Sequence, residues 1–584
     1  MKYTLALLLM MPPLLAISQV DVFDHFVDNE TILPGFEDQV FQLHVREKVR
    51  SDIQSNPAHD YTDQVVVMVH GNSVPAPAVF DLEFEDYSWM GYLAAAGYDV
   101  YAMSMTGYGL STRPQPMQDS CNVGFFDRLA YDIDCGTPSY GFTMVSSDSE
   151  MDDLDAVVEF VRQRRGVERV TLIGHSLGGF RVMLYASRFP EKINKVITHG
   201  FSGASFLSQA NPPDPLPSEG SAISLLGRSE IAELWAEATC RDQFDPAVLD
   251  PAWEAIASTD PLSNVWSSVE EVSRHPTIDL YGLTNDTIET IAVPTLVLIG
   301  EVDNIAPPFA ASAFYDRLAS TEKVFMEINR TSHAGYWEER KEIIYELCRE
   351  WLEETQIAGR STGKGIFKLN ETIDWIGEFD DQTPPQVAST FPADSTFNVP
   401  LEIDLELILD ENISGLAEHL TVFRAADNSV FDYIELDNEE RVTQICSNIL
   451  NFDIPALEED TDYYVYVHFD AFIDRSFNAF EGILTDKEWR FSTGEGEIVN
   501  TTNVPENRAW TVAPNPARNQ VHLIIGNEWG VPAHFRILNA RGQLVTEGLM
   551  RDNLEIDSST WPTGLYFVQV RDTTTWTTQK LVIQ

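Results

Sequence analysis

The clearest candidate for a chemically active residue in this sequence is a serine with one glycine two positions before it and another two positions after it. Ser176 is the centre of Gly174-His175-Ser176-Leu177-Gly178, which follows the apolar run Val170–Ile173. A serine on a tight turn from strand to helix presents its hydroxyl above the edge of a sheet, and small residues two positions before and after it let the backbones pass closely. The pattern predicts that Ser176 is a nucleophile and that Gly174 and Gly178 support its turn.

A serine nucleophile needs a base to take its proton and a carboxylate to orient that base. His333 and Asp303 each follow a short apolar run closely, so we predict that His333 is the base and Asp303 the orienting acid. Glu301 is the alternative acid. Because the carboxyl ends of parallel strands meet at one edge of a sheet, we expect Ser176, Asp303 and His333 to converge there.

The oxyanion of an acyl-transfer reaction needs hydrogen-bond donors as well. His70-Gly71-Asn72 directly follows the apolar run Val65–Val69, and we expect the backbone N–H groups of Asn72 and Leu177 to form an oxyanion hole. Since these donors belong to the backbone, the shape of the loop matters more than the side chain. Packing and backbone hydrogen bonding are enough to account for His70, His175 and His199, to which we assign no proton transfer.

The elements that must position these residues alternate between short apolar runs and amphipathic stretches from about residue 60 to 354. This alternation is typical of a mostly parallel sheet with helices on both faces. A helix is predicted between two of the strands by apolar residues at helical spacing from Leu154 to Val161, with Ser147 and Glu150 as a capping box and Gly166 at its end. The predicted strands are Val65–Val69, Asp99–Met103, Val170–Ile173, Lys195–Thr198, Thr295–Ile299 and Lys323–Ile328.

Residues 203–289 interrupt the alternation with a proline-rich segment and helical pieces. We interpret this stretch as a cap inserted over the site. Its aromatic residues Trp235, Trp253 and Trp266 are expected in the core of the cap rather than in contact with substrate.

The beginning of the sequence is typical of a signal peptide over residues 1–18. Lys2 precedes an apolar run, and Ala16-Ile17-Ser18 offers a cleavage site with small residues. A membrane anchor or a core strand is the alternative, but the run is shorter than the roughly 20 residues that a span requires, and two prolines break it. No other segment is apolar enough to cross a bilayer.

The composition is strongly acidic. Asp and Glu number 91 and Lys and Arg 38, which gives a formal net charge of −53. Such a surface repels phosphate backbones, so nucleic acid and anionic lipid are poor candidate partners. Cys121 and Cys135 lie on one loop and can either close a disulfide or stay free, and no cysteine lies at a metal-ligand spacing.

Past about residue 360, helical periodicity gives way to short alternating strands and turns. We predict that the α/β domain covers residues 19–360 and that a β-sandwich covers 361–495. A polar linker at 496–509 and a second, small β-sandwich at 510–584 complete the predicted multidomain chain.

The segment from about 60 to 356 resembles the α/β-hydrolase superfamily, in its lipase- and esterase-like branch. The resemblance rests on Gly-His-Ser-x-Gly-Gly and on the chain order Ser176, Asp303, His333. It implies acyl transfer to water through an acyl-enzyme on Ser176, without cofactor or metal. Relatives that open epoxides or remove halides use aspartate as nucleophile, so Ser176 argues against both. Ser104 departs from the aspartate of many members, which affects only local loop geometry.

The two later domains resemble further families. Pro392-Ala393-Asp394 and the ending Trp489-Arg490-Phe491-Ser492-Thr493 are similar to bacterial Ig-like domains of the SbsA type, which implies a spacing or adhesive role. Val512-Ala513-Pro514-Asn515-Pro516-Ala517, then Leu538-Asn539-Ala540-Arg541-Gly542 and Pro562-Thr563-Gly564-Leu565-Tyr566, resemble the sorting domain of type IX (Por) secretion. That resemblance implies handling by the type IX machinery, export from a Gram-negative cell, and release or attachment at its surface.

These features together predict a secreted or surface-attached serine hydrolase that cleaves a small-molecule or lipid-like carboxylic ester. A C–C bond, lactone or amide hydrolase using the same triad is an alternative, because the chemistry of the serine turn does not separate these reactions. An α/β domain that is catalytically silent and serves as a surface binding module is the alternative from another class.

Overall fold

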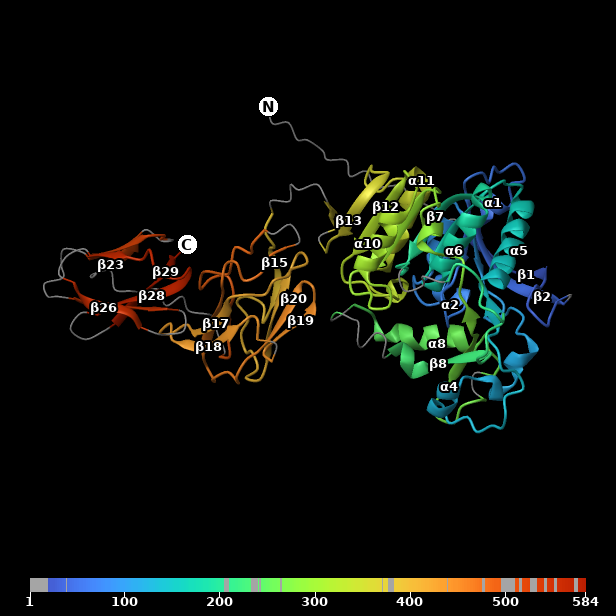
Figure 1. Ribbon diagram of the computed structural model, residues 1–584. Helices are drawn as coiled ribbons and strands as arrows, with labels where there is room; N and C mark the ends of the chain where they lie inside the picture. Colours follow the sequence, from blue (N-terminus) through green and yellow to red (C-terminus); the bar gives the residue numbers. More distant parts are fainter. Residues whose placement is uncertain are drawn as a thin grey trace, which may run out of the picture. The chain divides into compact units, whose positions relative to one another are not determined.

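In the computed structural model, shown in Figure 1, the described residues form two compact units divided near residue 377. The predicted signal peptide at 1–18 and the predicted linker at 496–509 lie outside the described residues. The structure describes residues 19–37, 39–203, 209–232, 240, 243–262, 265–369, 371–376, 383–438, 440–474, 478–494, 510–513, 517–525, 533–539, 544–550, 554–571 and 576–583.

The first unit is built on a ten-stranded sheet in the order β1-β2-β4-β3-β6-β7-β11-β12-β13-β14. The six predicted strands are its parallel centre, which confirms the predicted mostly parallel sheet. The strands are β1 (Val20–Glu30), β2 (Val40–Arg50), β3 (Val65–Val69), β4 (Asp99–Met103), β6 (Val170–His175), β7 (Ile193–His199), β11 (Thr295–Gly300), β12 (Lys323–Ile328), β13 (Thr362–Phe367) and β14 (Ile373–Ile376).

Strands outside the predicted set extend the sheet at both edges. The hairpin of β1 and β2 adds antiparallel to β4. At the other edge β13 pairs parallel with β12, and β14 follows antiparallel. The sheet therefore continues past the boundary predicted near 360, because the backbone of β12 finds its outer hydrogen-bond partner in β13.

Helices cover both faces of the sheet, and the residues of β3 show the division. Val65, Val67 and Val69 pack toward the face that α5, α6 and α10 cover, whereas Val66 and Met68 pack toward α3 and α11. Helices described in this unit are α1 (Ser51–Gln54), α2 (Ala76–Phe80), α3 (Trp89–Ala95), α4 (Phe125–Ala130), α5 (Ser147–Arg165), α6 (Leu177–Arg188), α8 (Leu249–Ala257), α9 (Asn285–Ile288), α10 (Pro308–Arg317) and α11 (Lys341–Glu354).

The predicted helix at Leu154–Val161 is the centre of α5, and Gly166 ends it in the left-handed conformation, as predicted. The predicted capping box was wrong by one residue. Ser146, not Ser147, caps the helix, and Ser149 completes the box. Glu150 takes no part in the capping box, and its carboxylate pairs with buried Arg181 instead.

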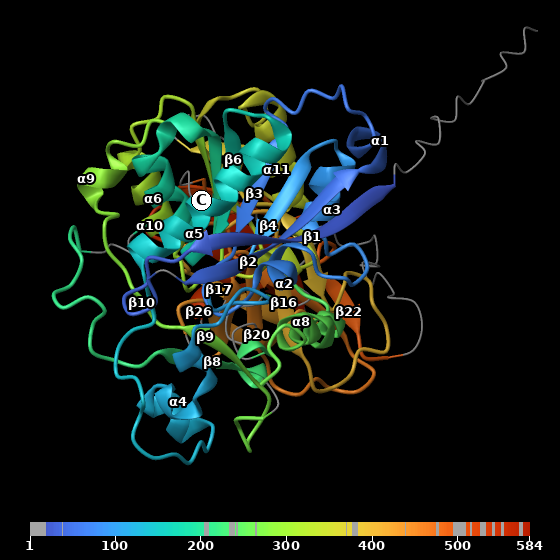
Figure 2. The ribbon, with the colours of Figure 1, turned by 90° about the vertical axis from the view of Figure 1, so that its right-hand side faces the viewer.

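The cap predicted over 203–289 contains α8 and an antiparallel hairpin of β8 (Ile223–Gly227) and β9 (Val272–Pro276). A second segment, residues 113–146, packs against it: Val123 forms a bridge to Ile223, and both belong to one apolar cluster. Figures 1 and 2 show α4, from this segment, next to β8. The sequence pattern did not predict this partnership, because the bridged residues Val123 and Ile223 are 100 residues apart and the two segments share no period.

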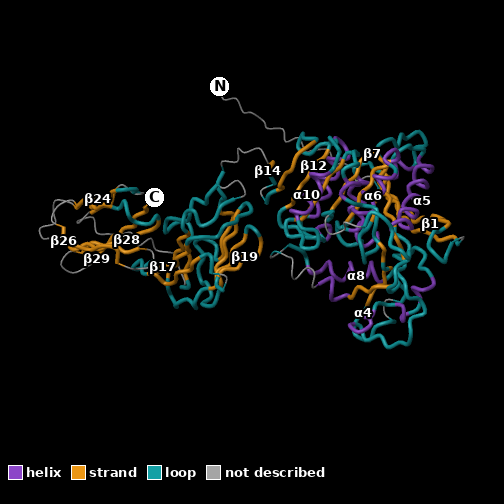
Figure 3. The backbone as a smooth tube through the Cα atoms, in the orientation of Figure 1, coloured by secondary structure: helices purple, strands orange, loops and turns teal. Residues whose placement is uncertain are grey.

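The second unit consists of antiparallel sheets, and Figure 3 shows its described residues as strands and loops. Residues 387–492 form two four-stranded sheets around one apolar core, β15-β16-β20-β19 and β18-β17-β21-β22. Residues 510–583 form a three-stranded and a four-stranded sheet around another core, β23-β24-β27 and β26-β25-β28-β29. Both predicted all-β domains are confirmed.

The strands of the second unit are β15 (Val387–Phe391), β16 (Asp404–Leu409), β17 (His419–Arg424), β18 (Val430–Glu435), β19 (Val442–Cys446), β20 (Ile449–Asp453), β21 (Asp462–Val467), β22 (Arg490–Ser492), β23 (Trp510–Ala513), β24 (Gln520–Ile525), β25 (Ala533–Asn539), β26 (Leu544–Met550), β27 (Leu554–Asp557), β28 (Gly564–Arg571) and β29 (Trp576–Ile583). Among the described residues, no helix has the length and apolar character that a membrane span needs. Cys121 and Cys135 are free thiols in the structure.

Candidate active site

Ser176 stands at the junction of β6 and α6, in a backbone conformation that few residues adopt. Its φ is 52° and its ψ is −121°, and a non-glycine residue with positive φ is strained unless its surroundings hold it. The surroundings do so by close backbone approach. A Cβ atom on Gly178 would lie 2.0 Å from the carbonyl oxygen of Val69, and one on Gly174 would lie 2.3 Å from that of Gly178. Only glycine fits at either position.

The carboxylate of Asp303 accepts from Nδ1 of His333, at 3.0 Å through Oδ1 and 2.9 Å through Oδ2. Asp303 is buried, and the backbone N–H groups of Ile305 and Ala306 also donate to Oδ1. Because an ionised carboxylate only accepts, Nδ1 of His333 carries the proton and Nε2 is left as an acceptor. This is the tautomer that a general base requires.

Glu301, the alternative acid, is engaged elsewhere. Its Oε2 accepts from the backbone N–H of Arg330 at 2.8 Å. The structure therefore pairs His333 with Asp303 and uses Glu301 to hold the loop after β12.

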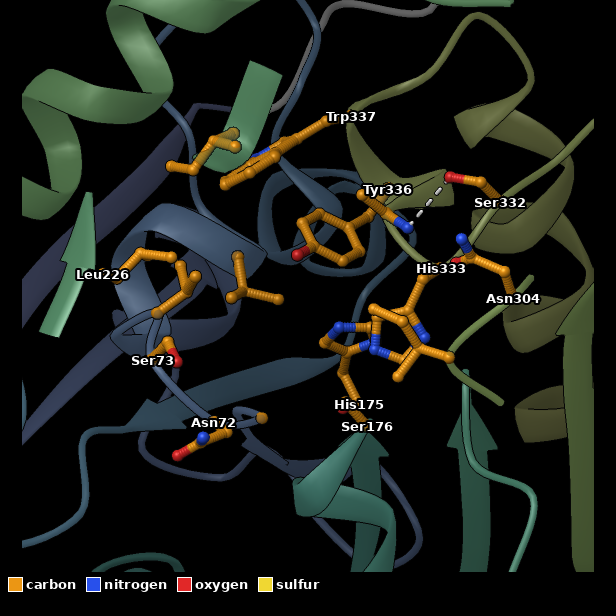
Figure 4. A pocket seen from close by; sticks show the side chains of 16 residues that line it. Asn72, Ser73, His175, Ser176, Leu226, Asn304, Ser332, His333, Tyr336 and Trp337 are labelled. Carbon is orange, nitrogen blue, oxygen red and sulfur yellow. Dashed lines mark hydrogen bonds between the residues drawn. The ribbon is translucent and has the colours of Figure 1, made fainter. Parts of the chain in front are cut away.

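Ser176 and His333 line the same cavity, whose volume is about 360 Å³. Figure 4 shows His333 and His175 with their rings side by side above Ser176. The remaining walls are largely apolar and include cap residues Leu226 and Ile231. Sequence reasoning missed this apolar lining because it comes from four separate stretches of the chain. The lining residues are Gly71, Asn72, Ser73, Val74, Val79, His175, Ser176, Leu226, Ile231, Asn304, Ile305, Ser332, His333, Ala334, Tyr336 and Trp337.

The loop with Asn72 is held from below by a buried ion pair. Nη1 of Arg181 donates to the carbonyl oxygens of His70 and Gly71, at 2.7 and 3.2 Å. The guanidinium is fixed in turn by Glu150, to which its Nε donates at 3.0 Å. Arg181 therefore holds the backbone of the loop at the place where Asn72 lines the cavity.

Leu177 is the first residue of α6, and the first N–H groups of a helix have no acceptor within the helix. The positive end of the helix dipole lies at the same place.

The loop that contains Asn72 makes two further side-chain contacts. The hydroxyl of Tyr108 donates to Oδ1 of Asn72 at 2.8 Å, and Ser73 Oγ lies 3.1 Å from Nε2 of cap residue His275. Neither contact was predicted from the sequence.

His175 packs beside the candidate base, and His199 packs against His175. Ring centroids of His175 and His333 are 4.9 Å apart, and Nδ1 of His175 lies 3.1 Å from Nδ1 of His199. Burial lowers the pKa of His175 well below its ordinary value and that of His199 to about 3. Both rings are therefore neutral at pH 7 and place no positive charge beside His333.

The structure describes two of the three predicted cap tryptophans, and both lie outside the cavity lining. Trp253 is buried and its Nε1 donates to Glu271, and the guanidinium of Arg274 stacks over Trp266 at 4.7 Å. Neither residue lines the cavity. Trp235 lies outside the described residues.

Family models match this chain in three places. An alpha/beta hydrolase fold matches residues 64–220, a bacterial Ig-like domain matches 381–493, and a secretion system C-terminal sorting domain matches 511–584. The order is the one predicted from the motifs. The sorting domain indicates type IX secretion to the cell surface or the extracellular space.

Individual relatives are distant. The chain is 24% identical over 325 residues to a poly(3-hydroxyalkanoate) polymerase subunit, PhaC, of Haloferax mediterranei, covering 49% of this chain and 64% of that protein's length. It is 26% identical over 231 residues to a 2-hydroxy-6-oxononadienedioate/2-hydroxy-6-oxononatrienedioate hydrolase of Paraburkholderia phymatum, covering 37% and 75%. Among solved structures, a thermophilic esterase from Thermogutta terrifontis matches with a TM-score of 0.34 and 15% identity, over 57% of this chain and 99% of that one.

Proposed function

We propose that this chain, which joins an α/β hydrolase domain to a bacterial Ig-like domain and a secretion sorting domain, is an exported serine hydrolase that cleaves carboxylic esters through an acyl-enzyme on Ser176. The observation that carries the proposal is the pair of hydrogen bonds between Asp303 and His333, at the wall of the cavity that Ser176 also lines. A histidine in this tautomer next to a strained serine is suited to nucleophilic catalysis.

In the proposed reaction, Oγ of Ser176 attacks the ester carbonyl carbon while Nε2 of His333 takes the hydroxyl proton. The backbone N–H groups of Asn72 and Leu177 hold the negative oxygen of the tetrahedral intermediate. The C–O bond to the alcohol then breaks, and His333 returns the proton to the leaving oxygen. A water molecule, deprotonated by the same histidine, attacks the acyl-enzyme and releases the carboxylic acid with Ser176 restored.

The cavity favours a neutral substrate. Among the described residues that line it, none is Lys, Arg, Asp or Glu. An anionic substrate would leave its charge without a partner in an apolar space, which costs several kcal/mol. The Paraburkholderia phymatum relative is named for a substrate with two carboxylates, and this lining offers no cation to bind them. We therefore favour simple esters with an apolar acyl group over such C–C bond substrates.

Turnover by a variant without the hydroxyl tests the proposal. Ser176→Ala is expected to abolish hydrolysis of short p-nitrophenyl esters, with circular dichroism unchanged. Ser187→Ala is the matched control, since the Ser187 hydroxyl at the end of α6 donates only to the carbonyl oxygen of Leu184. Unchanged turnover by Ser176→Ala contradicts the proposal. Amide and lactone substrates in the same assay decide between ester cleavage and the alternative reactions of this triad, and no turnover of any of them by the wild type favours a binding module.

A further inference from the structure

The loop that carries His333 is anchored by a buried glutamate, Glu338, which takes no direct part in the proposed reaction. Its side chain is fully buried. The backbone N–H of Ser332 donates to its Oε2 at 3.0 Å, and the Ser332 hydroxyl donates to its Oε1. Ser332 immediately precedes His333, so this carboxyl group fixes the backbone from which the candidate base projects.

A residue of the cap binds the same carboxyl group. Nε2 of Gln243 donates to Oε2 of Glu338 at 2.8 Å, and both side chains are buried. The orientation of the Gln243 amide is set because its Oε1 accepts from the backbone N–H of Cys240 at 2.6 Å. The carboxyl group of Glu338 therefore joins the cap to the loop of the candidate base.

We propose that Glu338 is a positioning residue for His333: it fixes the base against Ser176 and ties the cap segment at Gln243 to that arrangement. This inference rests on the proposed function of Ser176 and His333. The effect acts on the chemical step, because the Glu338 carboxyl group holds Ser332, which is joined directly to His333 in the chain.

The two oxygens of the Glu338 carboxyl group have different hydrogen-bond partners, so the side chain of a glutamine can take the place of the glutamate side chain. Oε2 accepts from the Gln243 amide and is the nearer acceptor of the Ser332 N–H, at 3.0 Å against 3.3 Å for Oε1. Oε1 meets the Ser332 hydroxyl, which can donate or accept. A glutamine can therefore place its oxygen at the Oε2 position and its NH₂ toward Ser332 Oγ, which then accepts. An alanine leaves all three donors without a partner.

The protonation of Glu338 supports the same geometry. Burial raises the pKa of Glu338 to about 7, and the negative charge of Asp303 adds to this increase. Burial raises the pKa of Tyr336, and the charge of Glu338 adds to that increase. Protonation of Glu338 near pH 7 removes none of its hydrogen bonds, because a proton on Oε1 is donated to Ser332 Oγ.

The experiment compares Glu338→Ala and Glu338→Gln with the full-length wild type, and uses Glu339→Ala as control. Glu339 is the adjacent, exposed glutamate. The measurements are kcat and KM for p-nitrophenyl butyrate and the rate constant for labelling of Ser176 by a fluorophosphonate. We expect Glu338→Ala to lower kcat and the labelling rate about 10- to 100-fold with little change in KM, because a small displacement of a base has such effects. Glu338→Gln and Glu339→Ala should stay within about 3-fold of the wild type, since both leave the base in place.

Three results overturn the inference: wild-type rates in Glu338→Ala, a loss confined to KM, or a loss in Glu338→Gln as large as in Glu338→Ala. If Glu338→Ala does not fold, Ser332→Ala removes a single donor, and an unchanged kcat in that variant overturns the inference as well. A wild type that no fluorophosphonate labels contradicts the proposed function itself. A labelled wild type with an equally reactive Glu338→Ala contradicts the role of Glu338 alone.

Discussion

Nδ1 of His333 lies 2.9 Å from Oδ2 and 3.0 Å from Oδ1 of Asp303, so both carboxylate oxygens face one ring nitrogen. This relationship fixes the histidine tautomer and leaves Nε2 toward the cavity that Ser176 lines. The proposed proton transfer from Ser176 requires this contact.

Asp303→Asn tests the orienting role of the carboxylate. The amide can present its NH₂ group to Nδ1 and so stabilise the wrong tautomer, and we expect kcat for p-nitrophenyl butyrate to fall about 10³- to 10⁴-fold with KM nearly unchanged. Glu301→Gln is the control, because Glu301 binds the backbone of Arg330. A larger loss of kcat in Glu301→Gln than in Asp303→Asn would identify Glu301 as the acid.

The two glycines of the serine turn are expected to tolerate no side chain. Gly178→Ala places a Cβ atom 2.0 Å from the carbonyl oxygen of Val69, a distance that backbone atoms cannot relieve without moving β3. We expect a destabilisation of more than about 4 kcal/mol or a failure to fold, seen in chemical unfolding. Gly141→Ala is the matched control, since nothing lies within 4 Å of its Cβ position. Equal stability of the two variants would contradict the close packing of the turn.

Acid is expected to destabilise the hydrolase unit through its buried histidines. Burial lowers the pKa of His275 to about 4, against about 6.5 in an unfolded chain. Between these values the unfolded state binds a proton that the folded state does not, so stability is lost as pH falls from about 6.5 to 4. One such group accounts for about 3 kcal/mol.

His275→Gln isolates that contribution, because glutamine does not titrate. The fall in unfolding midpoint between pH 7 and pH 4.5 should be smaller in this variant by several degrees. His59→Gln is the control, since His59 lies on the surface turn before β3 and contacts Gln64. An identical fall in the wild type and His275→Gln would show that His275 is not neutral in the folded protein.

Leu226→Ala tests the acyl side of the cavity. Leu226 reaches the cavity from β8 of the cap, and its truncation opens space at an apolar wall. We expect the preference for longer over shorter p-nitrophenyl esters, measured as a ratio of kcat/KM, to rise about 10-fold. Leu225→Ala, whose side chain packs in the neighbouring cluster of the cap, is the control. A ratio unchanged in Leu226→Ala places the acyl group elsewhere.

The parallel centre of the sheet was predictable because its strands are buried on both faces and read as continuous apolar runs, as Val65–Val69 does. The ends of those runs located Ser176, Asp303 and His333 at one edge. The hairpin of β1 and β2 was not predicted, because its strands alternate buried and exposed residues and lack the continuous apolar runs that mark the central strands.

The contacts that complete the site were not predictable for another reason. Glu338 and Gln243 are 95 residues apart, and a glutamate after two aromatic residues carries no pattern that distinguishes a buried carboxyl from an exposed one. The Ser146 cap shows the limit on a smaller scale: two serines follow each other, and only the backbone geometry decides which of them caps α5.

The most direct test of the central claim is to locate a covalent adduct by mass spectrometry after the full-length protein has reacted with a fluorophosphonate. We expect a single adduct on the peptide that contains Ser176, absent from Ser176→Ala and formed far more slowly by His333→Gln. An adduct on a different residue, or a protein that stays unmodified while it hydrolyses esters, would contradict it.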